Sequence, residues 1–130
     1  GVEVARNAAP TLKRVHQELG GKSPNIILED ADLAKTITAG VGSVMMNSGQ
    51  SCVAPTRMLA PKSKVDQICA LAKEAAESWM PGDPKGNARM GPVVSEAQWN
   101  KVQGLIKKGI EEGAELVTGG PGKPEGLEMK

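Results

Sequence analysis

Apolar residues recur at helical spacing in two central stretches of the chain. The earlier stretch runs from about Ala31 to Met46, behind Asp30 and Asp32, whose carboxylates suit the N-cap of a helix. Glycines at positions 40 and 42 weaken this helix intrinsically, so we expect close packing against it there. The later stretch is the clearest amphipathic helix, with one apolar stripe made of Val65, Ile68, Cys69, Ala72, Ala75, Ala76 and Trp79.

A third helix is predicted to open at Ser95, because Ser95 and Gln98 have the spacing of a capping box. Gly113 ends it. Its inward face is expected to carry Trp99, Val102, Ile106 and Ile110. The preceding segment PGDPKGN, residues 81–87, is predicted to be a loop from its composition.

Four short segments have the character of strands. Leu12–Leu19 (LKRVHQEL) shows alternation, and Asn25–Leu28 (NIIL) is an apolar run that suits a buried strand. Arg57–Pro61 and Ala114–Gly120 are predicted to be two more. Short apolar strands that alternate with helices indicate an α/β fold, layered, with a mostly parallel sheet flanked by helices.

Neither end of the sequence carries a closing element. Gly1–Ala9 is helix-like but has no cap and no preceding strand. The tail GPGKPEGLEMK, from Gly120 to Lys130, consists mainly of Gly, Pro and charged residues. We therefore expect the chain to be a piece of a larger protein.

Composition narrows the class of function. Hydrophobic residues make up 39% of the 130 residues, but there is no Phe or Tyr, which makes the expected core lean. A formal charge of +1 and few aromatic residues argue against nucleic acid as a partner. No apolar run approaches the roughly 20 residues that span a bilayer, so we expect no membrane partner. Two cysteines without metal-like spacing predict free thiols, no metal site and a cytoplasmic location.

One of the two cysteines, Cys52, lies among residues that rarely build a core. Its segment NSGQSCVAPTR, residues 47–57, combines a turn-forming glycine with polar side chains and a proline. Such a loop exposes backbone amides, which can stabilise a thiolate and an adjacent oxyanion. Cys52 is therefore a candidate nucleophile. Cys69 is the contrast, because it lies within an apolar helical stripe and is expected to be a core residue.

Glu18 is the second candidate. It ends a predicted strand and precedes LGGKSP, where glycine backbones leave room for a ligand, so it can serve as a general base. An ordinary carboxylate paired with Lys22 or Arg14 is the alternative on spacing alone. His16 shares strand parity with Glu18, and with Cys52 it offers the third member of a cysteine hydrolase, although a histidine with no chemical role is the simpler interpretation.

Together the two segments resemble the aldehyde dehydrogenase superfamily. QELGGKSPNIILEDADL (Gln17–Leu33) and NSGQSCVAPTR match its E-L-G-G-K-S-P and G-Q-x-C motifs, and Glu18 and Cys52 lie 52 − 18 = 34 positions apart, as in that family. GPVVSEAQWNKV and GAELVTGG resemble the segments that follow. The resemblance covers essentially the whole chain and implies part of an aldehyde-dehydrogenase-like catalytic domain.

The resemblance also implies a mechanism. Cys52 attacks an aldehyde carbon, hydride leaves to NAD or NADP, and Glu18 activates the water that hydrolyses the resulting thioester to a carboxylic acid. Leu19 and Gly20 are expected beside the nicotinamide, and Gly1 matches the last glycine of the family's phosphate-side turn. The implied partners are a small-molecule aldehyde and further copies of the chain in a homo-oligomer.

The sequence also departs from the family pattern. The cofactor-binding half and a downstream segment that contacts the nicotinamide ribose are not in these 130 residues, so residues 1–130 are expected to form a partial catalytic domain that is inactive alone. A non-enzymatic folding or assembly unit, whose apolar surface is covered by other parts, is the alternative from a different class. Neither the aldehyde nor the choice between NAD and NADP is specified by the sequence.

Overall fold

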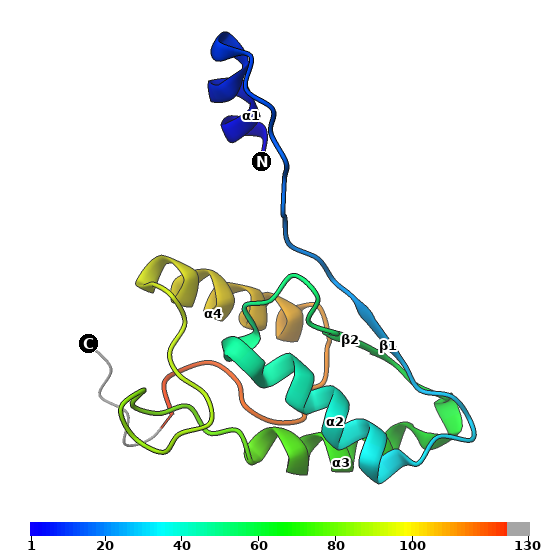
Figure 1. Ribbon diagram of the computed structural model, residues 1–130. Coiled ribbons are helices and arrows are strands. Elements are labelled where there is room, and N and C mark those ends of the chain that lie inside the picture. Colours follow the sequence, from blue (N-terminus) through cyan, green and yellow to red (C-terminus); the bar gives the residue numbers. More distant parts are fainter. Residues whose placement is uncertain (125–130) are drawn as a thin grey trace.

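The computed structural model describes residues 1–124, so the last six residues of the expected C-terminal tail lie outside the described part (Figure 1). The elements in chain order are α1 (Val2–Ala8), η1 (Ala9–Thr11), β1 (Pro24–Ile26), α2 (Leu33–Met45), η2 (Met46–Gly49), β2 (Arg57–Leu59), η3 (Lys62–Lys64), α3 (Val65–Glu77) and α4 (Glu96–Glu111). All the helices predicted from periodicity form.

The two strands β1 and β2 pair in parallel, with Pro24 opposite Arg57 and Ile26 opposite Leu59. Parallel neighbours require a crossover connection, and α2 supplies it. The strand that follows α2 leads into α3, and the two helices lie side by side in Figure 1. This βαβα order with a parallel sheet confirms the predicted α/β fold, although the sheet of the described residues has only two strands.

The core lies where α2 and α3 pack together against β1. Ile37 of α2 is fully buried, and it belongs to a cluster of Ile27, Ile37, Val41, Ile68 and Ala75. Ile27 follows β1 directly and carries the sheet's contribution to this cluster. The opposite side of the strand pair is open, since Ile26, Leu28 and Leu59 are 61%, 63% and 51% exposed. The core is small, as the scarcity of aromatic residues predicted.

The start of α2 and its two glycines behave as predicted. Asp32 is the N-cap, and its carboxylate accepts a hydrogen bond from the backbone N–H of Lys35 at 3.2 Å. A Cβ at Gly40 would collide with the carboxamide of Asn25 from β1. Gly40 therefore leaves room for the Asn25 side chain, and Gly42 leaves room for the Trp79 ring, whose nearest atom is 3.4 Å from where a Cβ would stand.

α4 is held less tightly than the other long helices. Ser95 caps it as predicted, accepting a hydrogen bond from the backbone N–H of Gln98 at 3.2 Å. None of its sixteen residues is fully buried. Trp99, Val102 and Ile106 are half-buried, but Ile110 is 41% exposed, so the predicted inward face is wrong at its last position. The helix packs on the rest only through a partly covered stripe.

Two predicted strands do not form. Residues 13–19 are extended but pair with no other described segment, and Leu12 before them has a left-handed backbone with a φ of 53°. Only Val15 among residues 12–19 is half-buried. Residues 114–120 also lack a partner among the described residues, and Gly119 and Gly120 have positive φ values of 72° and 120°. Alternation is a local pattern, whereas a strand needs a neighbouring strand for its hydrogen bonds. Residues 81–87 form a loop with turns, as predicted.

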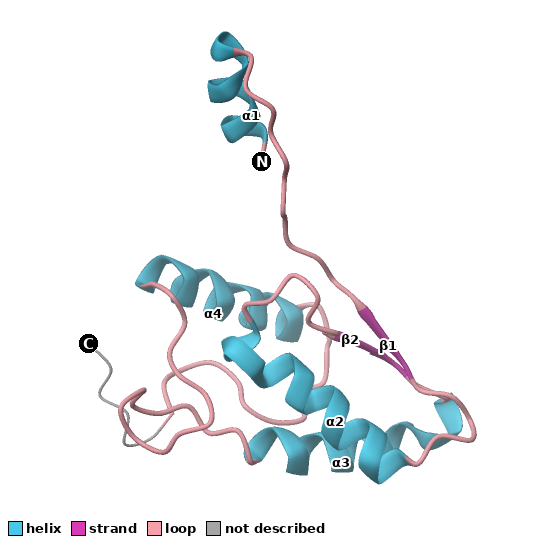
Figure 2. Cartoon of the chain, viewed as in Figure 1, coloured by secondary structure: helices cyan, strands magenta, loops and turns pink. Residues whose placement is uncertain are grey.

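Residues 12–23 form an arm that joins α1 to the body, and Figure 2 shows α1 standing apart from the other elements at the end of it. The arm is fixed at its C-terminal end. The side chain of Arg57 donates to the Lys22 carbonyl at 2.8 Å, and its backbone N–H donates to the Ser23 carbonyl at 3.3 Å. At Gly21 the arm lies so close to the loop before β2 that an added Cβ would be 2.8 Å from the Cys52 carbonyl oxygen.

No helix within residues 1–124 has both the length and the apolar character that crossing a bilayer demands.

The close approach at Gly21 generates a prediction. Gly21→Ala places a methyl group against a backbone oxygen that cannot rotate away, so the arm or the Cys52 loop has to shift, at a cost of about 1–3 kcal/mol. Gly20→Ala is the matched control, because nothing lies within 4 Å of a Cβ at Gly20. Both variants stiffen the unfolded chain equally, so the difference between them isolates the contact. Urea unfolding should show Gly21→Ala to be the less stable variant, and equal midpoints would contradict the contact.

Candidate functional site

Cys52 lies in the loop between η2 and β2, and its side chain is exposed. This confirms the prediction that the thiol is presented by a polar loop. The loop turns between Ser51 and Ala54, where the backbone N–H of Ala54 donates to the Ser51 carbonyl at 3.2 Å. The backbone N–H groups of Ser51, Cys52 and Val53 donate to no group within residues 1–124. The loop thus presents free amides around the thiol, which is the arrangement that an oxyanion requires.

Glu18 lies on the arm, in an unpaired extended segment rather than at the end of a strand. Its side chain is 81% exposed. The Nε2 atom of His16 is 2.9 Å from Glu18 Oε1, within hydrogen-bonding distance. Lys22 does not pair with Glu18; its ammonium group donates instead to the Gly21 carbonyl at 3.1 Å. His16, not Lys22 or Arg14, is therefore the partner of this carboxylate.

The arm and the loop face one another across an open depression of about 410 Å³. Its lining consists of Glu18, Leu19, Gly20, Gly21 and Lys22 from the arm and of Gly49, Gln50, Ser51 and Cys52 from the loop. The structure thus brings the predicted nucleophile and the predicted base to one hollow. His16 is not part of this lining, so the triad of a cysteine hydrolase is not assembled around Cys52.

Two of the three residues predicted to contact a cofactor, Leu19 and Gly20, follow one another along the arm. Leu19 and Gly20 line the depression next to Glu18. Gly1 lies outside that lining but close by, because a Cβ built on it would be 3.2 Å from Cδ2 of Leu19. The side chain of Gln17 donates to the Gly1 carbonyl at 3.1 Å and holds the start of α1 against the arm.

The turn immediately before Cys52 has an unusual backbone. Asn47, Ser48 and Gly49 all have positive φ values, of 52°, 56° and 72°. A left-handed conformation costs a non-glycine residue on the order of 1–2 kcal/mol, so it persists only where the surroundings hold it. Side-chain hydrogen bonds from Asn47, Ser48 and Gln50 do so here. The sequence predicted a turn in this segment but did not predict a run of left-handed residues.

The second cysteine lies elsewhere. Cys69 is half-buried on α3 and does not belong to the buried core cluster, so its prediction as a core residue is wrong, and it does not line the depression. The described residues contain no group of three or more His, Cys, Asp and Glu side chains arranged to hold a metal ion.

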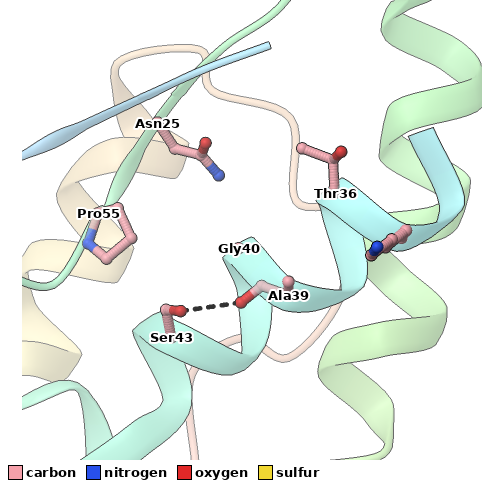
Figure 3. Close-up of a pocket in the computed structure, with 7 residues that line it drawn as sticks. Asn25, Thr36, Ala39, Gly40, Ser43 and Pro55 are labelled. Carbon is pink, nitrogen blue, oxygen red and sulfur yellow. Dashed lines mark hydrogen bonds between the residues drawn. The ribbon is translucent and has the colours of Figure 1, made fainter. Parts of the chain in front are cut away.

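A second hollow, of about 530 Å³, lies between β1 and α2. Figure 3 shows Asn25 and Pro55 on one side of it and the α2 residues Thr36, Ala39, Gly40 and Ser43 on the other. The hydroxyl of Ser43 donates to the Ala39 carbonyl at 2.9 Å, within its own helix. With Lys35 as the single ionisable side chain of its lining, this hollow offers no pair of groups for acid–base or nucleophilic chemistry.

Comparisons with known proteins agree with the family resemblance of the sequence. Residues 1–130 match the model of the Aldehyde dehydrogenase family. Over 129 residues the chain is 50% identical to 3-succinoylsemialdehyde-pyridine dehydrogenase of a Pseudomonas species, and the match covers 98% of this chain and 27% of that protein. The chain thus spans about a quarter of the length of the curated relatives that it matches.

Solved structures resemble it equally well. A cysteine-to-alanine mutant of aldehyde dehydrogenase C from Pseudomonas syringae, complexed with NAD+ and octanal, superposes with a TM-score of 0.91 at 50% identity, over 96% of this chain and 26% of that one. Aldehyde dehydrogenase from Mycobacterium tuberculosis, complexed with NAD+, gives 0.89 at 52% identity over 98% of this chain and 26% of that one. With a family match along its whole length and a shared fold, this chain belongs to the aldehyde dehydrogenase family.

Proposed function

We propose that this chain carries the nucleophile and the general base of an NAD(P)+-dependent aldehyde dehydrogenase, and that it acts as part of a longer polypeptide. The observation that carries the proposal is the common lining of one depression by Cys52 and Glu18. The similar structures with NAD+, one of them also with octanal, support an aldehyde as substrate and a nicotinamide cofactor. Residues 1–130 then form the nucleophile-bearing part of the catalytic domain.

Cys52 opens the reaction. Its thiolate attacks the aldehyde carbon, the new C–S bond forms, and the carbonyl electron pair moves to oxygen. The free backbone N–H groups around Cys52 stabilise that oxyanion. A nicotinamide bound beside Leu19 and Gly20 would supply the two-electron oxidant for the hydride of this carbon, and Cys52 would then carry the acyl group on its sulfur as a thioester.

Glu18 completes the reaction. Its carboxylate removes a proton from a water molecule in the depression, and the oxygen of that water attacks the thioester carbon. The C–S bond then breaks, a carboxylic acid leaves, the Cys52 thiolate is restored, and Glu18 releases its proton to solvent. The Nε2 atom of His16, which is 2.9 Å from Oε1 of Glu18, orients the carboxylate during this step.

The arm fits a flat ring beside these groups. Leu19 offers an apolar surface, and Gly20 has open space where a side chain would stand, since nothing lies within 4 Å of a Cβ there. Leu19 and Gly20 would hold the nicotinamide, and Gly1 would approach the phosphate side. The remaining cofactor contacts would come from the longer polypeptide, which we propose to be a cytoplasmic homo-oligomer.

A folding or assembly unit without catalysis is the second candidate. The open apolar side of the sheet, formed by Ile26, Leu28 and Leu59, favours it, because exposed apolar surface of this kind is usually buried by another part of a protein or by a partner. The two candidates make opposite predictions for Cys52. An assembly unit does not need the thiol, whereas the enzyme cannot work without it.

Replacement of the nucleophile tests the proposal directly. Cys52→Ser in the full-length dehydrogenase should abolish NAD(P)+-dependent aldehyde oxidation, because an alcohol is a far weaker nucleophile than a thiolate. Cys69→Ala is the matched control and should keep its activity, since that thiol lies outside the depression. Steady-state NADH formation measures both, and wild-type turnover by Cys52→Ser would refute the assignment and favour the assembly unit.

Glu18→Gln should separate the two halves of the reaction. Loss of a general base slows its step by roughly 10²–10⁴-fold, and here that step is hydrolysis of the thioester. Stopped-flow measurements should therefore show a burst of NADH close to one per site, followed by slow turnover. Glu74→Gln, at an exposed glutamate of α3, provides the control. Loss of the burst together with the steady state would assign Glu18 a different role.

The isolated 130 residues should neither bind the cofactor nor oxidise aldehydes. Few of the expected contacts belong to this chain, so the dissociation constant for NAD+ should be weaker than about 1 mM, which is a binding energy under about 4 kcal/mol. Isothermal titration calorimetry measures it, with the full-length dehydrogenase as the positive control. Micromolar binding by the isolated chain would show that most of the cofactor site is already present in it.

A further inference from the structure

Gln50 is the residue through which the strained turn and the Cys52 loop are joined. Its backbone N–H and its side-chain Nε2 both donate to the Asn47 carbonyl, at 3.1 and 3.0 Å. The Asn47 side chain returns a hydrogen bond to the Gln50 carbonyl at 2.9 Å. Three hydrogen bonds thus join Asn47 to Gln50 across the left-handed residues. Gln50 lies two positions before the proposed nucleophile.

The same side chain reaches across to a distant segment. The Oε1 atom of Gln50 accepts a hydrogen bond from the backbone N–H of Val94 at 2.8 Å, forty-four positions along the chain. Ser48 makes a parallel connection, its hydroxyl donating to the Gly91 carbonyl at 2.8 Å. The turn before Cys52 is therefore anchored to residues 91–94, which lead into α4.

The geometry points to Gln50 as a positioning residue for the nucleophile, an inference that rests on the proposed function. Its carboxamide uses both of its ends, the NH₂ group toward the strained turn and the oxygen toward Val94. The amides of residues 51–53 follow directly, so their direction depends on the path that the chain takes through Gln50. Gln50 also lines the depression, beside Cys52 and opposite the arm.

Alternative roles of Gln50 fit the contacts less well. A substrate-binding amide turns toward its ligand, whereas the nitrogen and the oxygen of this one each bond to a backbone group of the chain, which holds the carboxamide in place. Gln50 is half-buried, so it is not simply a solvated loop residue. Its effect on chemistry must then come through Cys52 and its amides.

The test compares the alkylation of the two thiols in the full-length dehydrogenase that carries this chain. Iodoacetamide reacts with thiolates, and mass spectrometry separates the products at Cys52 and Cys69, so Cys69 serves as an internal reference. Gln50→Ala should lower the alkylation rate of Cys52 by roughly tenfold, the effect of losing one hydrogen bond to a charged group, over a pH profile from about 6 to 9. The rate at Cys69 should stay unchanged. Because Cys52 is already exposed, greater access cannot compensate.

Three further variants make the result specific. Gln67→Ala, at an exposed glutamine of α3, is the matched control and should leave both rates unchanged. Val94→Pro removes the N–H that donates to Gln50, so it should lower the alkylation rate of Cys52 although no residue of the Cys52 loop is changed. If both substitutions act through this one bond, the double variant Gln50→Ala/Val94→Pro should be no slower than Gln50→Ala alone.

Three other outcomes would overturn either the positioning role of Gln50 or the assignment of Cys52 as the nucleophile. A Cys52 rate in Gln50→Ala equal to that in Gln67→Ala would overturn the positioning role and leave the proposed function intact. Equal changes at both thiols would indicate loosening of the whole fold and would also overturn it. If Cys52 in the parent chain reacts no faster than Cys69, the nucleophile assignment fails, and the role of Gln50 fails with it.

Discussion

The parallel pairing of β1 with β2 is the constraint on which the candidate site depends. With Pro24 opposite Arg57, Glu18 lies six residues before one strand and Cys52 five residues before its neighbour. Parallel strands start at the same edge of a sheet, so the two preceding segments must emerge side by side. An antiparallel pairing would send them to opposite ends, and a slip of three residues would displace one by about 10 Å, at roughly 3.3 Å per residue.

This placement determines what the backbone has to provide. Ligand sites in open α/β sheets usually lie beyond the carboxyl ends of the strands, where helix N-termini supply amides. Here the depression precedes the strands, and no long helix begins at it. The amides must therefore come from the loop itself. The left-handed run from Asn47 to Gly49 redirects the chain after α2, and the free N–H groups follow it at once.

The sequence revealed the local features of the fold more completely than the non-local ones. α2 and α4 were predictable because caps such as Asp32 and Ser95 act within their own first turn. Residues 12–19 were misassigned because alternation does not show whether a partner strand exists. The meeting of Glu18 with Cys52 followed from family resemblance rather than from periodicity. The hydrogen bond from the Val94 N–H to the Gln50 side chain could not be predicted, because the residues around Gln50 do not indicate which distant backbone group donates to it.

The exposure of the candidate site limits how strongly its charged and dipolar groups can act on one another. Glu18 is 81% exposed and Cys52 is exposed as well. Two unit charges 4 Å apart interact by about 1 kcal/mol in water but by about 4 kcal/mol at the effective dielectric of a protein surface. Oriented amides likewise stabilise an oxyanion strongly only where water is excluded. We infer a division of labour: this chain fixes the relative positions of nucleophile, amides and base, and the rest of a full-length dehydrogenase closes over them and lowers the dielectric around the reacting atoms.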